Sequence, residues 1–294
     1  MTNRRWAVGA RDPWQEVTVD GVTLAYNDEG AGLPIVCLHA IGHGAADFTA
    51  LLDRWRGRHR VIALDWPGQG RSRPDRVPAC ATRYTQLLAG LLDALEVPPA
   101  VLLGNSIGGA VAIRYAAANP GRVQALVLEN PGGLAPTGDV LARSVLAAMA
   151  RFFAAGARGA RWFPAAFAGY YRLCVIQRQA AAAHRQRIVA AASELAPLLL
   201  AAWRSFGDPA EDLRALAPAV TCPVLFAWAR RDQFVQLRRS RDAMRRFPAG
   251  RLETFPAGHA PHLETPEAFA AATERFLAEV APPASMRHAA LGST

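Results

Sequence analysis

Short apolar runs alternate with segments of helical periodicity along most of the chain. Apolar runs bounded by turn-forming or charged residues predict buried strands at 34–39, 60–65, 100–103, 123–128, 223–228 and 251–255. Hydrophobic residues recur at helical spacing in 47–56, 82–95, 107–118, 237–246 and 266–280. Strands and helices that alternate in this way predict a mostly parallel sheet with helices on both faces.

Two segments of alternating polarity precede this pattern. Residues 16–19 and 22–26 flank Asp20-Gly21, a dipeptide typical of a two-residue hairpin turn. We therefore expect an antiparallel hairpin at one edge of the sheet. Together with the buried runs, the hairpin predicts an eight-stranded α/β fold.

The alternation is interrupted in the middle of the chain. Residues 134–217 contain no clear strand and are rich in alanine and arginine, with helical stretches at 140–153 and 177–192. We interpret this block as a helical cap or lid inserted into one α/β core, which comprises 14–133 and 218–281. Residues 282–294 are expected to form a C-terminal tail.

A candidate nucleophile lies between a predicted strand and a predicted helix. Gly104-Asn105-Ser106-Ile107-Gly108 has the spacing of a nucleophile elbow, in which a serine occupies a sharp strand-to-helix turn. Glycines two residues before and after the serine avoid collisions with the backbone. The dipole of the following helix would stabilise negative charge that develops on a substrate oxygen.

A serine nucleophile requires a base, and the base requires an acid that orients it. His259 follows the last predicted strand, at the sheet edge where catalytic groups of α/β folds lie. His262 is the alternative base, but we expect it to pack or cap nearby. Asp232 follows the strand at 223–228 and is the candidate acid, with Glu129 as the alternative.

Two other side chains at strand ends favour structural roles. His39 ends a predicted strand and is expected to fix a loop, and Asp65 is followed by a Pro-Gly loop. The remaining histidines have no comparable placement and are expected at the surface: His43, His59, His184 and His288.

Five motifs resemble, in order, those of the α/β-hydrolase superfamily and its lid-bearing serine hydrolases. They are Leu38-His39-Ala40-Ile41-Gly42, the loop 65–72, the elbow 104–109, the acid segment 227–232 and the closing motif 258–264. The resemblance covers about residues 14–280. It implies the α/β-hydrolase fold and a catalytic triad of Ser106, Asp232 and His259, in which the first histidine of the closing motif is catalytic.

The same resemblance implies how a substrate oxygen would be bound. The backbone N–H groups of Ile41 and Ile107 would form the oxyanion hole. Ala40 stands where the family usually has glycine, which puts the shape of this loop in question. No cofactor and no metal is implied.

The serine at the elbow favours acyl transfer, because superfamily members that transfer alkyl groups have aspartate there. We expect hydrolysis of a carboxylic ester or related acyl bond through an acyl-enzyme. The elbow and segment 129–134 also resemble meta-cleavage product hydrolases, which break C–C bonds in anionic keto acids from aromatic ring cleavage. That activity is the first alternative. An acyltransferase, a perhydrolase and a non-catalytic ligand-binding protein are further alternatives.

The composition of the expected lid indicates which substrates it could bind. Between Leu134 and Arg204 the chain has nine arginines and two acidic residues, so that one arginine could bind a substrate carboxylate, or all could form a solvated basic surface. The aromatic stretch 161–171 would suit an apolar pocket or the lid's own core. The candidate substrate contacts are Phe48, Trp162 and Phe163. Contact of the lid with a membrane surface is a further alternative.

Composition narrows the expected partners. All 33 basic residues are arginine, against 24 acidic residues, and the formal net charge is +9. These arginines are dispersed, unlike the dense patches of nucleic-acid-binding proteins, and we attribute most of them to genome codon bias. The chain has no apolar stretch of 18 residues, no signal-peptide pattern and no CxxC motif. We expect a cytoplasmic protein that acts on a small molecule, without nucleic acid, metal or a transmembrane segment.

Overall fold

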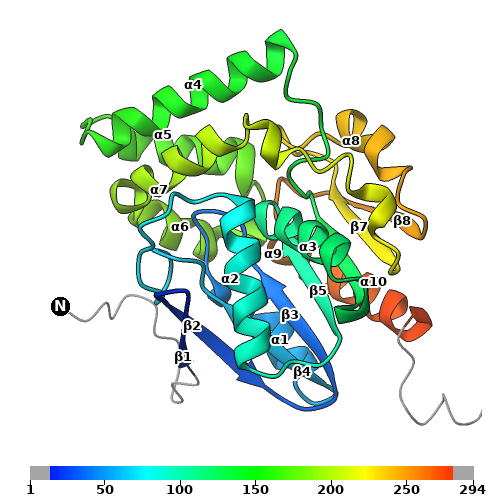
Figure 1. The fold of residues 1–294 in the computed structure, drawn as a ribbon. Coiled ribbons are helices and arrows are strands. Elements are labelled where there is room, and N and C mark those ends of the chain that lie inside the picture. The colour runs from blue at the N-terminus through cyan, green and yellow to red at the C-terminus, as the bar shows by residue number, and fades with distance from the viewer. Residues whose placement is uncertain (1–13, 281–294) are drawn as a thin grey trace, which may run out of the picture.

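An eight-stranded sheet forms the centre of the computed structural model, which describes residues 14–280 (Figure 1). Its strands are β1 (Trp14–Val19), β2 (Val22–Glu29), β3 (Leu33–Leu38), β4 (His59–Leu64), β5 (Ala100–Asn105), β6 (Val123–Glu129), β7 (Val224–Ala229) and β8 (Gly250–Phe255). They lie in the order β1-β2-β4-β3-β5-β6-β7-β8. The hairpin β1–β2 and the pair β2–β4 are antiparallel, and all other pairs are parallel. The prediction of a mostly parallel eight-stranded sheet is therefore confirmed.

Helices cover both faces of this sheet. The core helices are α1 (Thr49–Trp55), α2 (Ala81–Ala94), α3 (Ile107–Ala118), α8 (Leu237–Met244), α9 (Pro261–Glu264) and α10 (Pro266–Val280). Val36 and Leu38 of β3 belong to the apolar cluster that contains α2 and α3. Ile35 and Cys37 belong to the cluster of the other face, with α1 and α10. Each central strand thus buries alternate residues against opposite helical layers, because successive side chains of a strand point to opposite faces.

Between β6 and β7 the chain forms a helical insertion. It contains α4 (Val140–Ala157), α5 (Phe163–Tyr170), α6 (Ala182–Ala190) and α7 (Ala192–Ser205), and α4 lies on the side away from the sheet (Figure 1). Phe153 is buried between α4 and its neighbours, with its ring centroid 6.2 Å from that of Phe163 and 6.3 Å from that of Phe167. The aromatic side chains therefore give the insertion a core of its own.

The helices within this insertion differ from those that the sequence predicts. The segment 177–192, expected as one helix, contains the shorter α6, and the chain bends by 89° before α7. Among the described residues, α4 is long and apolar enough by length and composition to cross a membrane, and 11% of this stretch is buried. It packs along α7 within the insertion. The expected tail 282–294, with His288, lies outside the described residues.

Candidate active site

Ser106 occupies the sharp turn between β5 and α3. Its backbone has φ 56° and ψ −115°, a conformation that residues other than glycine seldom adopt. A Cβ atom at Gly104 would lie 2.5 Å from the Gly108 backbone, and one at Gly108 would lie 2.1 Å from the Leu38 carbonyl oxygen. The two glycines are therefore required by packing. The Ser106 N–H donates to the Glu129 carbonyl at 2.9 Å and ties the turn to β6.

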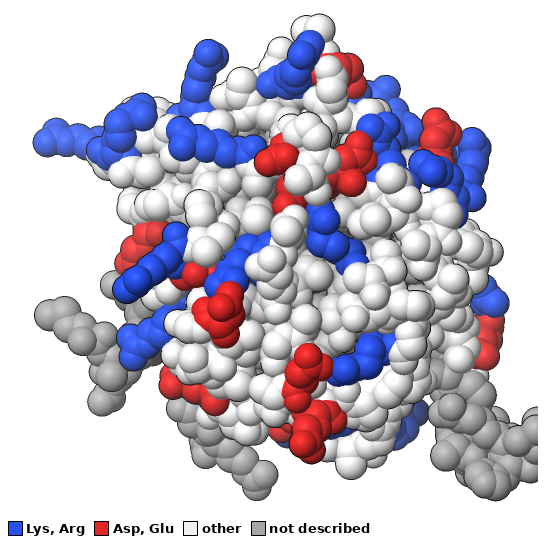
Figure 2. Space-filling view, in the orientation of Figure 1, with Lys and Arg blue, Asp and Glu red and all other residues white. Residues whose placement is uncertain are grey.

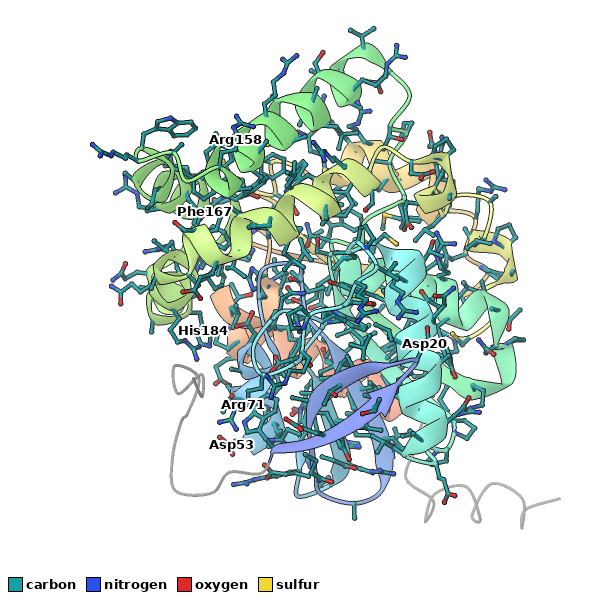
Figure 3. All side chains as sticks on the ribbon, turned by 60° about the vertical axis from the view of Figure 1, so that its left-hand side comes forward. Asp20, Asp53, Arg71, Arg158, Phe167 and His184 are labelled. Atoms are coloured by element: carbon teal, nitrogen blue, oxygen red, sulfur yellow. The ribbon has the colours of Figure 1, made fainter. Side chains whose placement is uncertain are left out.

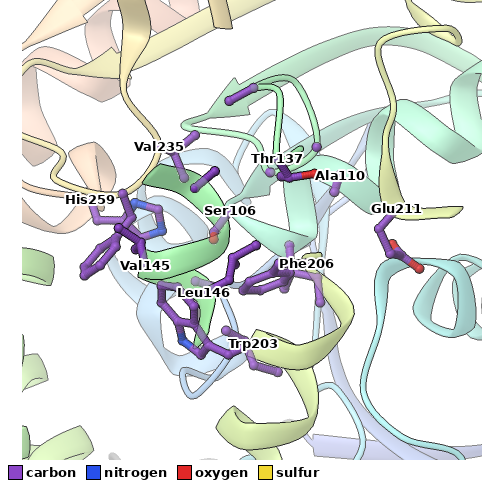
Figure 4. Close-up of a pocket in the computed structure, with 18 of the residues that line it drawn as sticks. Ser106, Ala110, Thr137, Val145, Leu146, Trp203, Phe206, Glu211, Val235 and His259 are labelled. Atoms are coloured by element: carbon purple, nitrogen blue, oxygen red, sulfur yellow. The ribbon is translucent and has the colours of Figure 1, made fainter. Parts of the chain in front are cut away.

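His259 and Asp232 come together from the loops that follow β8 and β7. His259 Nδ1 lies 2.5 Å from Asp232 Oδ2, while Asp232 Oδ1 accepts backbone hydrogen bonds from Phe234 and Val235 at 2.8 and 2.9 Å. Burial disfavours the charged imidazolium, but the Asp232 carboxylate outweighs it and raises the pKa of His259 above its ordinary value. Ser106 and His259 line the same pocket (Figure 4).

The alternative acid, Glu129, serves a different histidine. Glu129 Oε2 accepts hydrogen bonds from the backbone N–H and from Nδ1 of His262, at 3.0 and 2.9 Å. The His262 ring stacks on Phe48 with centroids 4.7 Å apart, and the pair is buried. Burial again opposes protonation, and the Glu129 carboxylate raises the pKa of His262. His262 thus packs near the site, as expected, and in the described chain the lining of the Ser106 pocket includes His259 but not His262.

The two expected oxyanion donors also border the pocket. Ile107 is the first residue of α3, and Ile41 lies in the loop after β3. Neither backbone N–H has a hydrogen-bond partner among residues 14–280, so both are available to a substrate oxygen. The Gly42 N–H next to Ile41 donates to Gln69 Oε1 at 2.6 Å. Gln69, which the sequence analysis did not single out, therefore fixes the loop that carries the Ile41 donor.

Comparison with known proteins shows to which family the chain belongs. The family model described as the alpha/beta hydrolase family matches residues 35–272. The chain belongs to the α/β-hydrolase family.

Relatives and solved structures agree with this assignment. The chain is 35% identical over 138 residues to a 2-hydroxy-6-oxo-2,4-heptadienoate hydrolase of Pseudomonas putida, a match that covers 46% of this chain and 48% of the relative. It is 35% identical over 124 residues to a 2-hydroxymuconate semialdehyde hydrolase of Pseudomonas sp. strain CF600, covering 41% and 44%. The matches thus span about half the length of these curated relatives.

Among solved structures, a thermophilic esterase from Thermogutta terrifontis, determined with malate bound, is similar with a TM-score of 0.74 and 24% identity. The likeness covers 90% of this chain and 99% of the esterase. It supports the fold and agrees with the family match.

An asparagine that the sequence analysis did not assign lies beside Asp232. Asn130 Nδ2 donates to Asp232 Oδ2 at 2.6 Å, and Asn130 Oδ1 accepts from the Ala229 N–H at 2.9 Å. Asn130 has φ 43°, a left-handed conformation that asparagine tolerates better than most residues. Its position directly after β6, next to the end of β7, was the available signal.

A buried carboxylate joins the His259 loop to the helical insertion. Glu264 Oε1 accepts backbone hydrogen bonds from Gly258 and His259 at 2.8 and 3.2 Å. Its Oε2 accepts from the backbone N–H groups of Gln177 and Arg178 at 2.8 and 2.9 Å. Displacement of the insertion would leave this carboxylate without two of its donors, so the position of the insertion is coupled to the His259 loop.

Both side chains expected to have structural roles stabilise loops. His39 Nε2 accepts the Trp66 N–H at 2.9 Å, and His39 Nδ1 donates to the Ala40 carbonyl at 2.7 Å. Burial lowers the pKa of His39 to about 4, so the ring is neutral near neutral pH. Asp65 Oδ1 accepts the Ala45 N–H at 2.7 Å. Ala40 itself is buried within this bonded loop.

Three expected substrate contacts lie away from the Ser106 pocket. Phe48 is fully buried against His262, and Phe163 is fully buried inside the insertion. Trp162 is 54% exposed to solvent. Among the described residues that line the Ser106 pocket, none of the three appears. Aromatic periodicity alone did not separate side chains that pack the insertion from side chains that border the cavity.

One expected surface histidine was also placed incorrectly. His43 is buried, its Nδ1 lies 2.5 Å from Asp47 Oδ2, and it borders the Ser106 pocket. Burial would raise the pKa of Asp47, but the adjacent His43 outweighs it and brings that pKa to about 2. His59 and His184 are only partly exposed.

The pocket is mainly apolar. Its lining includes Ile41, Ile107, Leu146, Leu199, Trp203 and Phe234. Arg239 is the one arginine in the lining formed by described residues, and it is paired with Asp139. Glu211 and Asp212 also border the pocket. The arginines of the segment 134–204 therefore point elsewhere. Within residues 14–280, no group of three or more His, Cys, Asp or Glu side chains could hold a metal ion.

Proposed function

We propose that the protein is a serine hydrolase that cleaves carboxylic esters with an apolar acyl group. One observation carries the proposal: Ser106, on a strained strand-to-helix turn, borders the same pocket as a histidine that is hydrogen-bonded to a buried carboxylate. This is the arrangement that nucleophilic catalysis by a hydroxyl group needs.

The mechanism follows from the placement of each group. His259 accepts the Ser106 proton as the serine oxygen bonds to the carbonyl carbon, and the N–H groups of Ile41 and Ile107 stabilise the oxyanion. His259 then donates that proton to the leaving alkoxide as the ester bond breaks. Water, deprotonated by His259, attacks the acyl-enzyme; the bond to the serine oxygen breaks, the acid leaves, and His259 returns the proton to Ser106. Asp232, held by Asn130, orients the imidazole.

The pocket supports a neutral, apolar acyl group. Its lining is mainly hydrophobic, Arg239 is already paired with Asp139, and two carboxylates, Glu211 and Asp212, stand at its border. The helical insertion supplies Leu199 and Trp203 to this lining and acts, in this proposal, as a cap that excludes water.

Hydrolysis of a C–C bond in an anionic keto acid is the second candidate. The activities for which the two Pseudomonas relatives are named favour it. Two features count against it: no unpaired arginine of the described chain borders the pocket, and the residue after His259 is the buried Ala260. The acyltransferase and perhydrolase alternatives share the mechanism as far as the acyl-enzyme.

A substrate panel tests the proposal. Purified protein is assayed on p-nitrophenyl esters of increasing acyl length and on 2-hydroxy-6-oxo-2,4-heptadienoate. We expect activity on the esters and a loss of about 10⁴-fold or more in kcat/KM for Ser106→Ala. Ser144→Ala, which alters an exposed serine outside the pocket, is the matched control and should behave as wild type. Activity on the keto acid alone would overturn the ester assignment, and an active Ser106→Ala would overturn the nucleophile.

A further inference from the structure

The N-terminal part of α4 exposes large apolar side chains to solvent. Val140 is 73% exposed, Leu141 61% and Val145 38%. Of the eighteen residues of α4, the fully buried ones are Phe153 and Gly156, which face the rest of the insertion. A helix of a monomeric protein normally directs such side chains toward the core, so this exposed apolar group marks a candidate interaction surface.

Arginines accompany these apolar side chains. Arg143, Arg151 and Arg158 are exposed and recur at spacings of about two helical turns, so they form one row along the helix. Leu141 and Val145, one turn apart, lie on the flank of the helix that borders the pocket. We call Val140, Leu141, Val145 and the three arginines the α4 face. Figure 3 shows Arg158 on the outer side of the insertion and Phe167 within it.

The Lys, Arg, Asp and Glu positions of this region are all arginine. Between Asp139 and Glu194 the sequence contains eight arginines and no acidic residue. Within the described chain, the three arginines of the α4 face make no ion pair. Figure 2 shows arginine side chains projecting from the part of the molecule where α4 lies in Figure 1. The face therefore combines apolar contact area with uncompensated positive charge.

This combination distinguishes between possible partners. In a symmetric dimer through this face, the arginine row would meet a second arginine row with no acid to separate them, and like charges would oppose association. An anionic lipid surface satisfies both properties, because its headgroups attract arginines while valine and leucine side chains enter the boundary with the acyl chains.

The pocket lies directly beneath this face. Leu141 and Val145 belong to the α4 face and also border the pocket that contains Ser106. A lipid surface bound to the α4 face would therefore contact two residues that line the pocket.

We propose that the α4 face docks the hydrolase on anionic lipid surfaces and admits ester substrates with acyl chains from the lipid layer. The docking is inferred from the exposed apolar and basic side chains alone. The substrate class, in contrast, rests on the proposed ester hydrolysis.

Flotation with lipid vesicles tests the docking. The inactive Ser106→Ala protein is mixed with vesicles of phosphatidylcholine, with or without phosphatidylglycerol, at low and at high salt. We expect binding to the anionic vesicles that weakens as salt rises. The triple variant Arg143→Gln, Arg151→Gln, Arg158→Gln should lower this binding by about tenfold or more. Its activity on a short soluble ester should be unchanged, because none of these arginines borders the pocket.

A second triple variant is the matched control. Arg58 and Arg122 directly precede β4 and β6, at the sheet edge opposite the insertion, and Arg275 lies on α10. Their replacement by glutamine removes the same net charge from exposed or half-exposed sites and should leave vesicle binding near the wild-type value.

Four results would overturn the docking. They are no binding of Ser106→Ala to anionic vesicles, equal binding to neutral vesicles, an equal loss in the control triple, or a wild-type dimer that Val140→Gln dissociates. Vesicle binding together with soluble-ester activity, but with no activity on vesicle-borne esters, would overturn the substrate and leave the docking and the ester hydrolysis in place.

Discussion

Two histidine–carboxylate pairs lie near each other in this protein, and of these two only one borders the pocket. His259 and His262 are three residues apart, each has a carboxylate oxygen within hydrogen-bond distance of Nδ1, and each has a raised pKa. Both carboxylates, Asp232 and Glu129, come from the carboxyl ends of neighbouring strands. By sequence position and by electrostatics, either pair could serve a nucleophile.

The two pairs differ in what surrounds the Nε2 atom of the histidine. His259 borders the pocket into which the Ser106 turn opens. His262 Nε2 is buried and has no hydrogen-bond partner among the described residues, and its ring is covered by Phe48. A histidine–carboxylate pair is therefore not evidence of catalysis by itself. The catalytic candidate is the pair whose second nitrogen can reach a nucleophile and a substrate.

Replacement of each histidine gives the largest expected difference. His259→Gln removes the proposed base and should lower kcat/KM on a p-nitrophenyl ester by about 10⁴-fold or more. His262→Gln removes a packing residue and should leave kcat/KM within about tenfold of wild type, with a lower unfolding temperature. Ester kinetics and thermal unfolding of both variants test this. Comparable losses of activity in two folded proteins would contradict the division of roles.

Replacement of the two carboxylates should show the same division of roles, with smaller effects on the rate. Asp232→Asn keeps the shape of the side chain but stabilises the wrong tautomer of His259, and should lower kcat by about 10³- to 10⁴-fold. Glu129→Gln should leave kcat within a few-fold and instead lower the free energy of unfolding by about 3 kcal/mol, because it breaks a buried pair.

The stability effect of Glu129→Gln has a defined pH dependence. Because the pKa of His262 is raised in the folded protein, the stabilisation from its proton is fully present below the ordinary histidine pKa and is lost as pH rises through the raised value. Urea unfolding at several pH values should therefore show the largest difference from wild type in acid and a smaller one in alkali. A difference that grows with pH would contradict the pairing of Glu129 with His262.

The sequence was sufficient for the sheet and for the Ser106 turn. Buried strands such as β3 and β7 are short apolar runs, and the glycines at 104 and 108 follow from collisions within a few residues of Ser106. These signals are local. The insertion gave weaker signals, because a segment dominated by alanine shows little periodicity and its aromatic residues pack against one another instead of the pocket.

The supporting contacts of the site were not predictable for a different reason. Asn130 reaches Asp232 across 102 positions of sequence, and Glu264 reaches Gln177 across 87. Which side chain meets which depends on the order of strands in the sheet and on the path of the insertion. A strand-end position indicates that a polar residue lies at the active edge, but not which partner it has there.

The pH dependence of ester hydrolysis gives the smallest and most specific test of the two pairs. His259 must be neutral to accept the Ser106 proton, and its raised pKa places the acid limb of kcat/KM above the pH expected for an ordinary histidine. The Asp232 carboxylate is the main cause of that rise, and the more distant Glu129 carboxylate contributes least. Glu129→Gln should therefore move the acid limb downward by less than about one pH unit without changing the plateau.

Glu253→Gln is the matched control for this shift, because it removes one carboxylate from an exposed ion pair with Arg275 and should leave the acid limb where it is. An upward shift in Glu129→Gln, or no acid limb in the wild type, would show that the titrating group is not His259. An equal shift in both variants would show that net charge, and not the second pair, sets the proton affinity of the base.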